Sequence, residues 1–81
     1  MDIRALSVNQ EIPQPNHVIV VKLGYQRFEV SGTAGCERKD ATYLRPLLFE
    51  QQTDALKRAE EFAAAHALQT IYVKGFRPTT G

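Results

Sequence analysis

Most of the residues that could carry chemistry lie in one stretch, SGTAGCERKDATYLRP, which holds the chain's only cysteine, Cys36. Arg38 and Lys39 follow closely, and neighbouring cations favour the thiolate, the nucleophilic form of a cysteine. Both histidines lie far away in the sequence, however, and no acid or amide is placed to orient such a base. We therefore expect an ordinary thiol at Cys36 and a protein that is not an enzyme.

The glycines of the same stretch could suggest a phosphate-binding loop. A P-loop has four residues between its glycines and a Lys-Ser/Thr pair directly after the second. Here Gly32 and Gly35 are three positions apart, and Lys39 lies four positions beyond Gly35. The histidines and Cys36 match no metal-ligand spacing either. The sequence therefore predicts no cofactor and no metal.

A binding surface is the remaining possibility for this part of the chain. Its candidate residues are Arg27, Arg38, Lys39, Tyr43 and Arg45. Two classes of partner are open: a protein that engages the loop and the strand after it, or nucleic acid bound by the basic side chains with stacking on tyrosine. The net charge is +1, from ten basic and nine acidic residues, which favours the protein partner.

The elements before this stretch form a predicted hairpin over Val18–Ser31. HVIVVKL, from His17 to Leu23, is rich in β-branched residues and is typical of a strand buried on both faces. In QRFEVS, apolar and polar residues alternate, which predicts a second strand. Gly24 and Tyr25 lie between the two, and glycine at the first position of a two-residue connection suits a type II′ turn.

Gly32, Gly35 and the charges after them predict a mobile loop, and the loop leads into the strand-like ATYLRPLLFE. Pro46 cannot donate a hydrogen bond to a neighbouring strand, so this segment is expected to be an edge strand or to contain a bulge. A homodimer through this edge is one further possibility.

The next segment predicts a helix over Gln52–Leu68. Its apolar residues fall on one arc with a spacing of three and four, and His66 lies at the C-terminal end of that arc, where it can meet the helix dipole. Thr53 or Gln51 is the expected N-cap, and Thr53 is the better one by chemistry. TIYVK then predicts a closing strand with Tyr72 on the face opposite its neighbours.

These elements predict a two-layer α+β domain, in which one helix covers an antiparallel sheet of three or four strands in the order β-β-β-α-β. Residues 1–16 form an arm or short strand with a proline-rich connector, residues 17–75 form the domain, and residues 76–81 form a tail. The expected shared core comprises Phe28, Val30, Leu56, Phe62, Ile71 and Val73.

Composition agrees with this outline. The chain has 81 residues, enough for one core, and a single cysteine excludes an internal disulfide. No apolar run has the length of a signal peptide or of a membrane span, so we expect a cytoplasmic protein.

From about Val18 to Gly75 the chain also resembles a small bacterial family of unknown function whose members run hairpin, helix, strand. The matching positions are Phe49, Ala55, Ala59, Ala63, Ile71, Val73 and Gly75. Gln51 stands where the family has a capping threonine, Leu68–Gln69 replaces its helix-ending glycine, and the loop from Gly32 to Ala41 is longer. The resemblance implies the fold and carries no activity with it.

The sequence as a whole predicts a small protein-interaction module. Small charge-balanced chains of this kind are common among accessory and inhibitor proteins of bacterial or phage mobile elements. This comparison is an analogy with a class of proteins. A nucleic-acid-binding domain that uses the sheet face and the patch of Arg38, Lys39 and Arg45 is the alternative.

Overall fold

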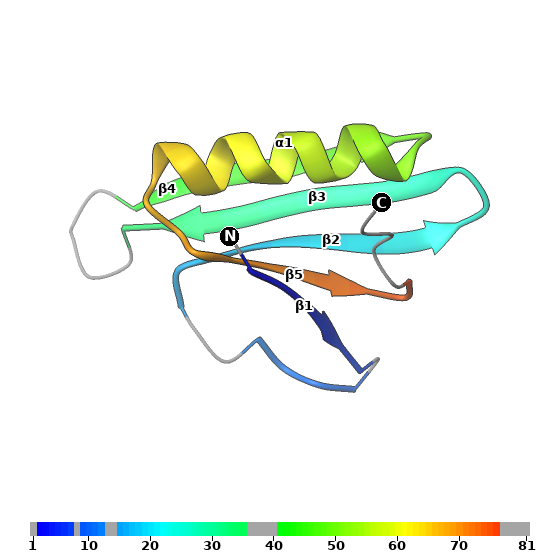
Figure 1. The fold of residues 1–81 in the computed structure, drawn as a ribbon, viewed down its shortest axis with the longest axis horizontal. Coiled ribbons are helices and arrows are strands. Elements are labelled where there is room, and N and C mark those ends of the chain that lie inside the picture. Colours follow the sequence, from blue (N-terminus) through cyan, green and yellow to red (C-terminus); the bar gives the residue numbers. More distant parts are fainter. Residues whose placement is uncertain (1, 8, 13–14, 36–40, 77–81) are drawn as a thin grey trace.

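The computed structural model describes residues 2–7, 9–12, 15–35 and 41–76. In these ranges five strands form one sheet, and one helix covers one face of it (Figure 1). The elements are β1 (Asp2–Leu6), β2 (His17–Gly24), β3 (Arg27–Ala34), β4 (Thr42–Phe49), α1 (Gln52–Ala65) and β5 (Thr70–Lys74). The predicted α+β class, with one helix on one face of a sheet, is confirmed.

The prediction of an antiparallel sheet of three or four strands was wrong in number and direction. The strand order is β1-β5-β2-β3-β4, in which β2–β3 and β3–β4 are antiparallel while β5 is parallel to both β1 and β2. The helix explains the direction of β5: α1 returns the chain to the end of the sheet at which β4 began, so β5 runs in the same direction as β4.

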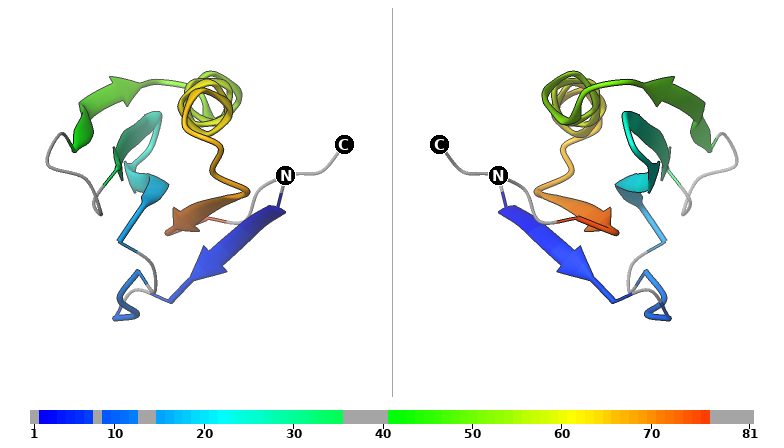
Figure 2. Two further views of the ribbon diagram at one scale, coloured as in Figure 1. Left: turned by 90° about the vertical axis from the view of Figure 1, so that its left-hand side faces the viewer. Right: turned by 90° about the vertical axis from the view of Figure 1, so that its right-hand side faces the viewer.

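The N-terminal segment, expected as an arm or a short strand, forms a strand over Asp2–Leu6. It pairs with β5 from Asp2 opposite Thr70 to Leu6 opposite Lys74. Residues 9–12, between β1 and β2, lie on the side of the sheet opposite α1, as the end-on views in Figure 2 show. There Ile12 packs against a buried cluster of Leu6, Ile19 and Tyr72, so each face of the sheet has its own apolar cluster.

The main core lies between α1 and the sheet. Of the six predicted core residues, Leu56 is half-buried and packs against the core, and the other five are buried: Phe28, Val30, Phe62, Ile71 and Val73. Strand alternation in β3 and the arc of Ala55, Ala59, Phe62 and Ala63 in α1 bring these side chains together. This part of the prediction is confirmed.

The loop that was expected to begin at Gly32 begins later in the chain. Gly32 is buried inside β3, which continues to Ala34. A Cβ atom at Gly32 would lie 2.8 Å from Cε1 of Phe62 and 2.9 Å from the carbonyl oxygen of His17. Glycine is therefore needed here for a close approach of the helix to the strand, and it does not loosen the backbone.

The hairpin is present, but its turn differs from the predicted one. Strand β2 continues through Gly24, which pairs with Arg27, so the turn residues are Tyr25 and Gln26. A register irregularity between Lys22 and Gly24 shifts the turn by one residue. Gln26 has a positive φ of 54°, whereas the predicted type II′ turn would have required a positive φ at Gly24.

The start of α1 at Gln52 is as predicted, while the preferred cap and the end of the helix differ from expectation. The N-cap is Gln51, which makes no side-chain capping hydrogen bond, while Thr53 lies within the first turn. The helix ends at Ala65, short of the predicted Leu68, because Ala67 adopts a left-handed φ of 56°. The N–H of Leu68 then donates to the carbonyl oxygen of Ala63 at 2.8 Å, which is the bond that closes a Schellman motif. Among the described residues, no helix is long and apolar enough to cross a membrane.

Candidate interaction surface

Strand β4 lies at an edge of the sheet and also contains a bulge, the two arrangements expected from Pro46. On β3, one residue, Ser31, separates the partners of Leu44 and Leu47, whereas β4 has two residues there, Arg45 and Pro46. Proline has no backbone N–H to donate. Because of the extra residue, Pro46 lies at a position where the hydrogen-bond ladder needs no donor.

The bulge decides which side chains of β4 share a face. Directly paired residues of antiparallel strands point to the same face. Tyr43 pairs with Thr33 and Leu48 with Glu29, so both lie on the face opposite α1, while Leu47 lies on the α1 face. Strict alternation without the extra residue would have placed Tyr43 and Leu48 on opposite faces.

These three β4 residues are exposed and apolar in character. The exposed fraction is 68% for Tyr43, 63% for Leu48 and 38% for Leu47. We call them the β4 strip. The other large exposed hydrophobic side chains in the described ranges, Leu23 and Tyr25, lie at the turn between β2 and β3.

A groove continues from the α1 side of the strip. It encloses about 300 Å³ between β4 and the helix and is lined by Phe49, Asp54, Lys57, Arg58 and Glu61. Leu47 precedes Phe49 by two positions on the same face of β4. The groove walls carry charges of both signs, and the nearest approach of Arg58 to Glu61 is 3.8 Å. An apolar strip beside a mixed-charge rim has the anatomy of a protein–protein interface.

The predicted basic cluster is only partly assembled. Tyr43 and Arg45 are exposed near neighbours on β4. Arg27, the first residue of β3, is exposed at the opposite end from Thr33, the partner of Tyr43. Arg27 and Thr33 are six positions apart, which corresponds to about 20 Å along a strand. Glu29 lies between, on the same face.

The remaining predicted residues of the patch, Arg38 and Lys39, lie outside the described residues, as does Cys36. Sequence reasoning identified Tyr43 but did not single out Leu47 and Leu48 as surface residues. The position of Pro46 within the strand is the signal that could have shown their exposure, since a bulge there changes the face to which each side chain points.

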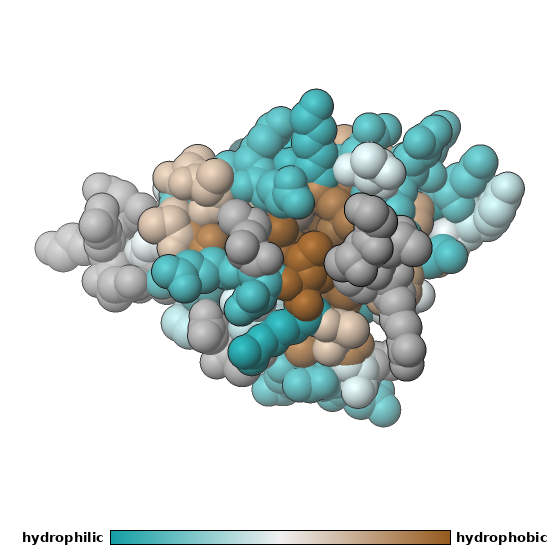
Figure 3. Space-filling model, viewed as in Figure 1, coloured by the Kyte–Doolittle hydropathy of each residue, from teal (hydrophilic) through white to brown (hydrophobic). Residues whose placement is uncertain are grey.

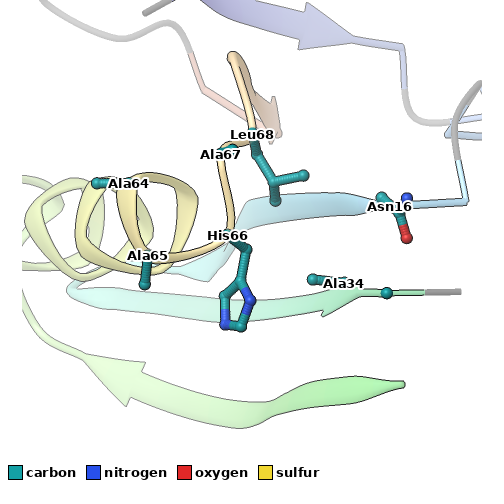
Figure 4. A pocket seen from close by; sticks show the side chains of 8 residues that line it. Asn16, Ala34, Ala64, Ala65, His66, Ala67 and Leu68 are labelled. Atoms are coloured by element: carbon teal, nitrogen blue, oxygen red, sulfur yellow. The ribbon is translucent and has the colours of Figure 1, made fainter. Parts of the chain in front are cut away.

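The C-terminal end of α1 borders a second hollow, of about 370 Å³ (Figure 4). Its walls are mainly small side chains from the helix end and β3, with two polar groups, Asn16 and His66. The His66 ring packs against Phe62, with ring centroids 4.5 Å apart. His66 is the C-cap residue, and its backbone N–H donates to the carbonyl oxygens of Phe62 and Ala63. The expected interaction of its imidazole with the helix dipole stays a prediction.

This hollow gives no basis for assigning a reaction. Its described lining residues supply one imidazole and one amide, and neither an acid nor a nucleophilic side chain is among them. Gly35 also lines it, and the next residue is Cys36. In the described ranges, no group of three His, Cys, Asp or Glu side chains is placed to hold a metal ion.

Comparisons of the chain with protein-family models, with curated proteins and with solved structures found no match. The function of the chain therefore has to be inferred from its own residues.

Proposed function

We propose that the chain is a non-enzymatic protein-interaction module that binds a partner protein through the β4 strip. The observation that carries the proposal is the concentration of Tyr43, Leu47 and Leu48, all exposed, on one edge strand. Exposed apolar side chains that cluster on one element, with charged groups around them, are typical of a surface that another protein covers.

The bulge favours a particular mode of binding. A partner strand added to β4 would need a regular row of backbone donors and acceptors, and this row is interrupted at Arg45 and Pro46. We therefore expect the partner to contact the side chains of the strip, with Tyr43 and Leu48 on one face and Leu47 leading into the groove beside α1. A second copy of the chain docked on the strip is one form of this proposal.

Nucleic-acid binding stays the alternative, supported by the proximity of Tyr43 and Arg45. An exposed tyrosine can stack on a base, and an arginine beside it can pair with a phosphate. Glu29 lies on the same face between Arg45 and Arg27, and its carboxylate opposes a phosphate backbone that would follow β3. By analogy with other small charge-balanced chains, the proposed role is that of an accessory or inhibitor protein of a mobile element.

The test compares two double variants that remove the same residue types from different places. Y43S/L48S removes two members of the strip, while L23S/Y25S removes an exposed leucine and tyrosine from the β2–β3 turn. Because all four side chains are exposed, both variants should keep the far-ultraviolet circular dichroism of the parent chain. Affinity capture from a lysate of source cells, with and without nuclease, then measures the bound partner.

We expect Y43S/L48S to lower the amount of captured protein about tenfold or more, the loss typical of two central interface residues. L23S/Y25S should capture as much as the parent chain, and nuclease should have no effect. Equal capture by both variants contradicts the role of the strip. Loss of capture after nuclease treatment, with a steep decrease between 50 and 200 mM salt in a binding assay, would instead support nucleic acid.

A further inference from the structure

The groove beside the β4 strip carries a balanced set of charges. Its lining residues include two acids, Asp54 and Glu61, and two bases, Lys57 and Arg58. Arg58 and Glu61 approach each other to 3.8 Å, and their side chains are 35% and 59% exposed. An exposed ion pair of this kind contributes little to the stability of the fold. Both charged groups are therefore accessible to a second molecule.

Strip and groove adjoin on one side of the molecule, the side formed by α1 and β4. Both elements run along the longest axis (Figure 1), and the molecule measures 37 × 23 × 22 Å along its principal axes. A side of 37 by 22 Å has an area of about 800 Å², which is the area that each partner buries in a stable interface of standard size. This side is therefore large enough to form a dimer.

The opposite side of α1 exposes less apolar surface. Apolar side chains are visible there between the helix and the strands below it (Figure 3). A hollow of about 460 Å³ on that side is lined by Gln52, Thr53, Leu56, Lys57 and Glu60, and its one apolar residue, Leu56, is half-buried. The members of the β4 strip, by contrast, are up to 68% exposed. The side formed by α1 and β4 is therefore the better surface for a second molecule.

We propose that the partner of the β4 strip is a second copy of the chain, related by a two-fold axis so that the strip of each copy lies against the groove of the other. This inference rests on the proposed function, because it names the partner of the same surface. Since strip and groove adjoin, one two-fold axis between them makes both contacts at once. The apolar side chains of each strip are then covered by a surface that the chain itself supplies.

The charges of the groove favour a second copy over a partner whose surface carries one sign of charge. Along α1, the acid Asp54 is followed by the two bases and then by the acid Glu61. A partner of one sign would repel two of these four groups, and like charges that face each other across an interface are strongly unfavourable. An antiparallel second copy can instead set Arg58 of each chain opposite Glu61 of the other.

Reversal of single charges in the groove tests the inference. Glu61→Arg leaves three bases and one acid in the groove, Arg58→Glu leaves three acids and one base, and both variants lose the same contact within the chain. The matched controls change the net charge equally at other places. They are Glu60→Arg, on the opposite side of α1, and Arg4→Glu, on β1 at the far edge of the sheet.

Sedimentation equilibrium at about 100 µM measures self-association, well above the micromolar Kd of weak standard-size interfaces, and circular dichroism checks that each variant is folded. We expect dimers of the parent chain and of both controls. E61R and R58E should each self-associate about tenfold or more weakly, because like charges then face each other. An equimolar mixture of E61R and R58E should form a heterodimer at least as tight as the parent dimer. A role of either residue only within its own chain would give no recovery in the mixture.

A monomeric parent chain, or a mixture of E61R and R58E that stays monomeric, would overturn the inference. So would a Y43S/L48S dimer as tight as the parent dimer, because the strip would then lie outside the interface. If the parent is monomeric while Y43S/L48S loses a captured protein of another kind, the proposed function stands and only the second copy is excluded. Failure of the proposed function itself has a different result, in which Y43S/L48S both captures and self-associates like the parent chain.

Discussion

At the scale of the residue, Gly32 shows how one missing side chain sets the distance between the two layers. The space for its Cβ is already taken by the Phe62 ring and by the backbone carbonyl of His17. The ring could rotate or shift, but the carbonyl belongs to the β2–β3 ladder and cannot move without disturbing it. We therefore expect Gly32→Ala to lower the free energy of unfolding by about 1–3 kcal/mol, the usual cost of overpacking.

Gly24 provides the control for this prediction. A Cβ at Gly24 would meet no atom within 4 Å, so Gly24→Ala should be neutral or slightly stabilising. Urea unfolding followed by circular dichroism measures both variants. An unchanged midpoint for Gly32→Ala would contradict the close packing of α1 on β3 at this point.

At the scale of the element, α1 ends where it does because Ala67 leaves helical geometry, and this ending offers a stabilising substitution. A left-handed φ of 56° costs an L-residue about 1–2 kcal/mol, and glycine avoids most of this cost. We expect Ala67→Gly to raise the melting temperature by about 4–8 °C, the shift that 1 kcal/mol produces in a domain of this size.

The control for this substitution lies three residues earlier in the chain. Ala64→Gly, at an exposed position inside α1, should instead destabilise the protein by about 1 kcal/mol, because glycine is a poor helix former. The opposite signs of the two melting-temperature shifts distinguish the helix-ending conformation of Ala67 from a general effect of adding glycine. A lower melting temperature for Ala67→Gly would contradict the assigned conformation.

The elements also show which parts of the structure a sequence can predict. Periodic apolar residues correctly located the hairpin, α1 and β5, because their patterns repeat over several residues. The faces to which the β4 side chains point and the residues of the β2–β3 turn could not be predicted. Each depends on an irregularity in the pairing of two neighbouring strands. The bulge at Arg45 and Pro46 places Tyr43 and Leu48 on the same face, and a single sequence shows only that a bulge is permitted there.

At the scale of the whole molecule, the number and direction of strands depend on contacts between distant parts of the chain. Residues 2–6 have no clear period of their own, and they form a strand because β5 offers an apolar edge about seventy residues away. Of the β4 strip, only Tyr43 was among the residues predicted from the sequence, together with its neighbour on β4, Arg45. The register sets Arg27 at the far end of β3, which the sequence does not show, and its part in a shared basic patch stays a prediction.

The main core joins α1 to four of the five strands, so its central aromatic residue should control the stability of the whole molecule. Phe62 is 5% exposed, contacts the space above Gly32 and packs against His66. Phe62→Ala should lower the free energy of unfolding by about 3–5 kcal/mol. This loss is comparable with the total stability of about 4–12 kcal/mol expected for a chain of this length.

Because Phe62→Ala could leave too little folded protein to measure, Phe62→Leu serves as the second variant, with a smaller expected loss of about 1–2 kcal/mol. The two probes of unfolding report on opposite faces of the sheet. Circular dichroism follows α1, and tyrosine fluorescence follows chiefly Tyr72, since Tyr25 and Tyr43 are already exposed in the folded state. If the sheet joins both apolar clusters into one cooperative unit, Phe62→Leu should shift the urea midpoint of both probes equally. A shift in circular dichroism alone would show that the cluster around Tyr72 is stable without α1, and an unchanged midpoint for Phe62→Ala would contradict the placement of Phe62 in the core.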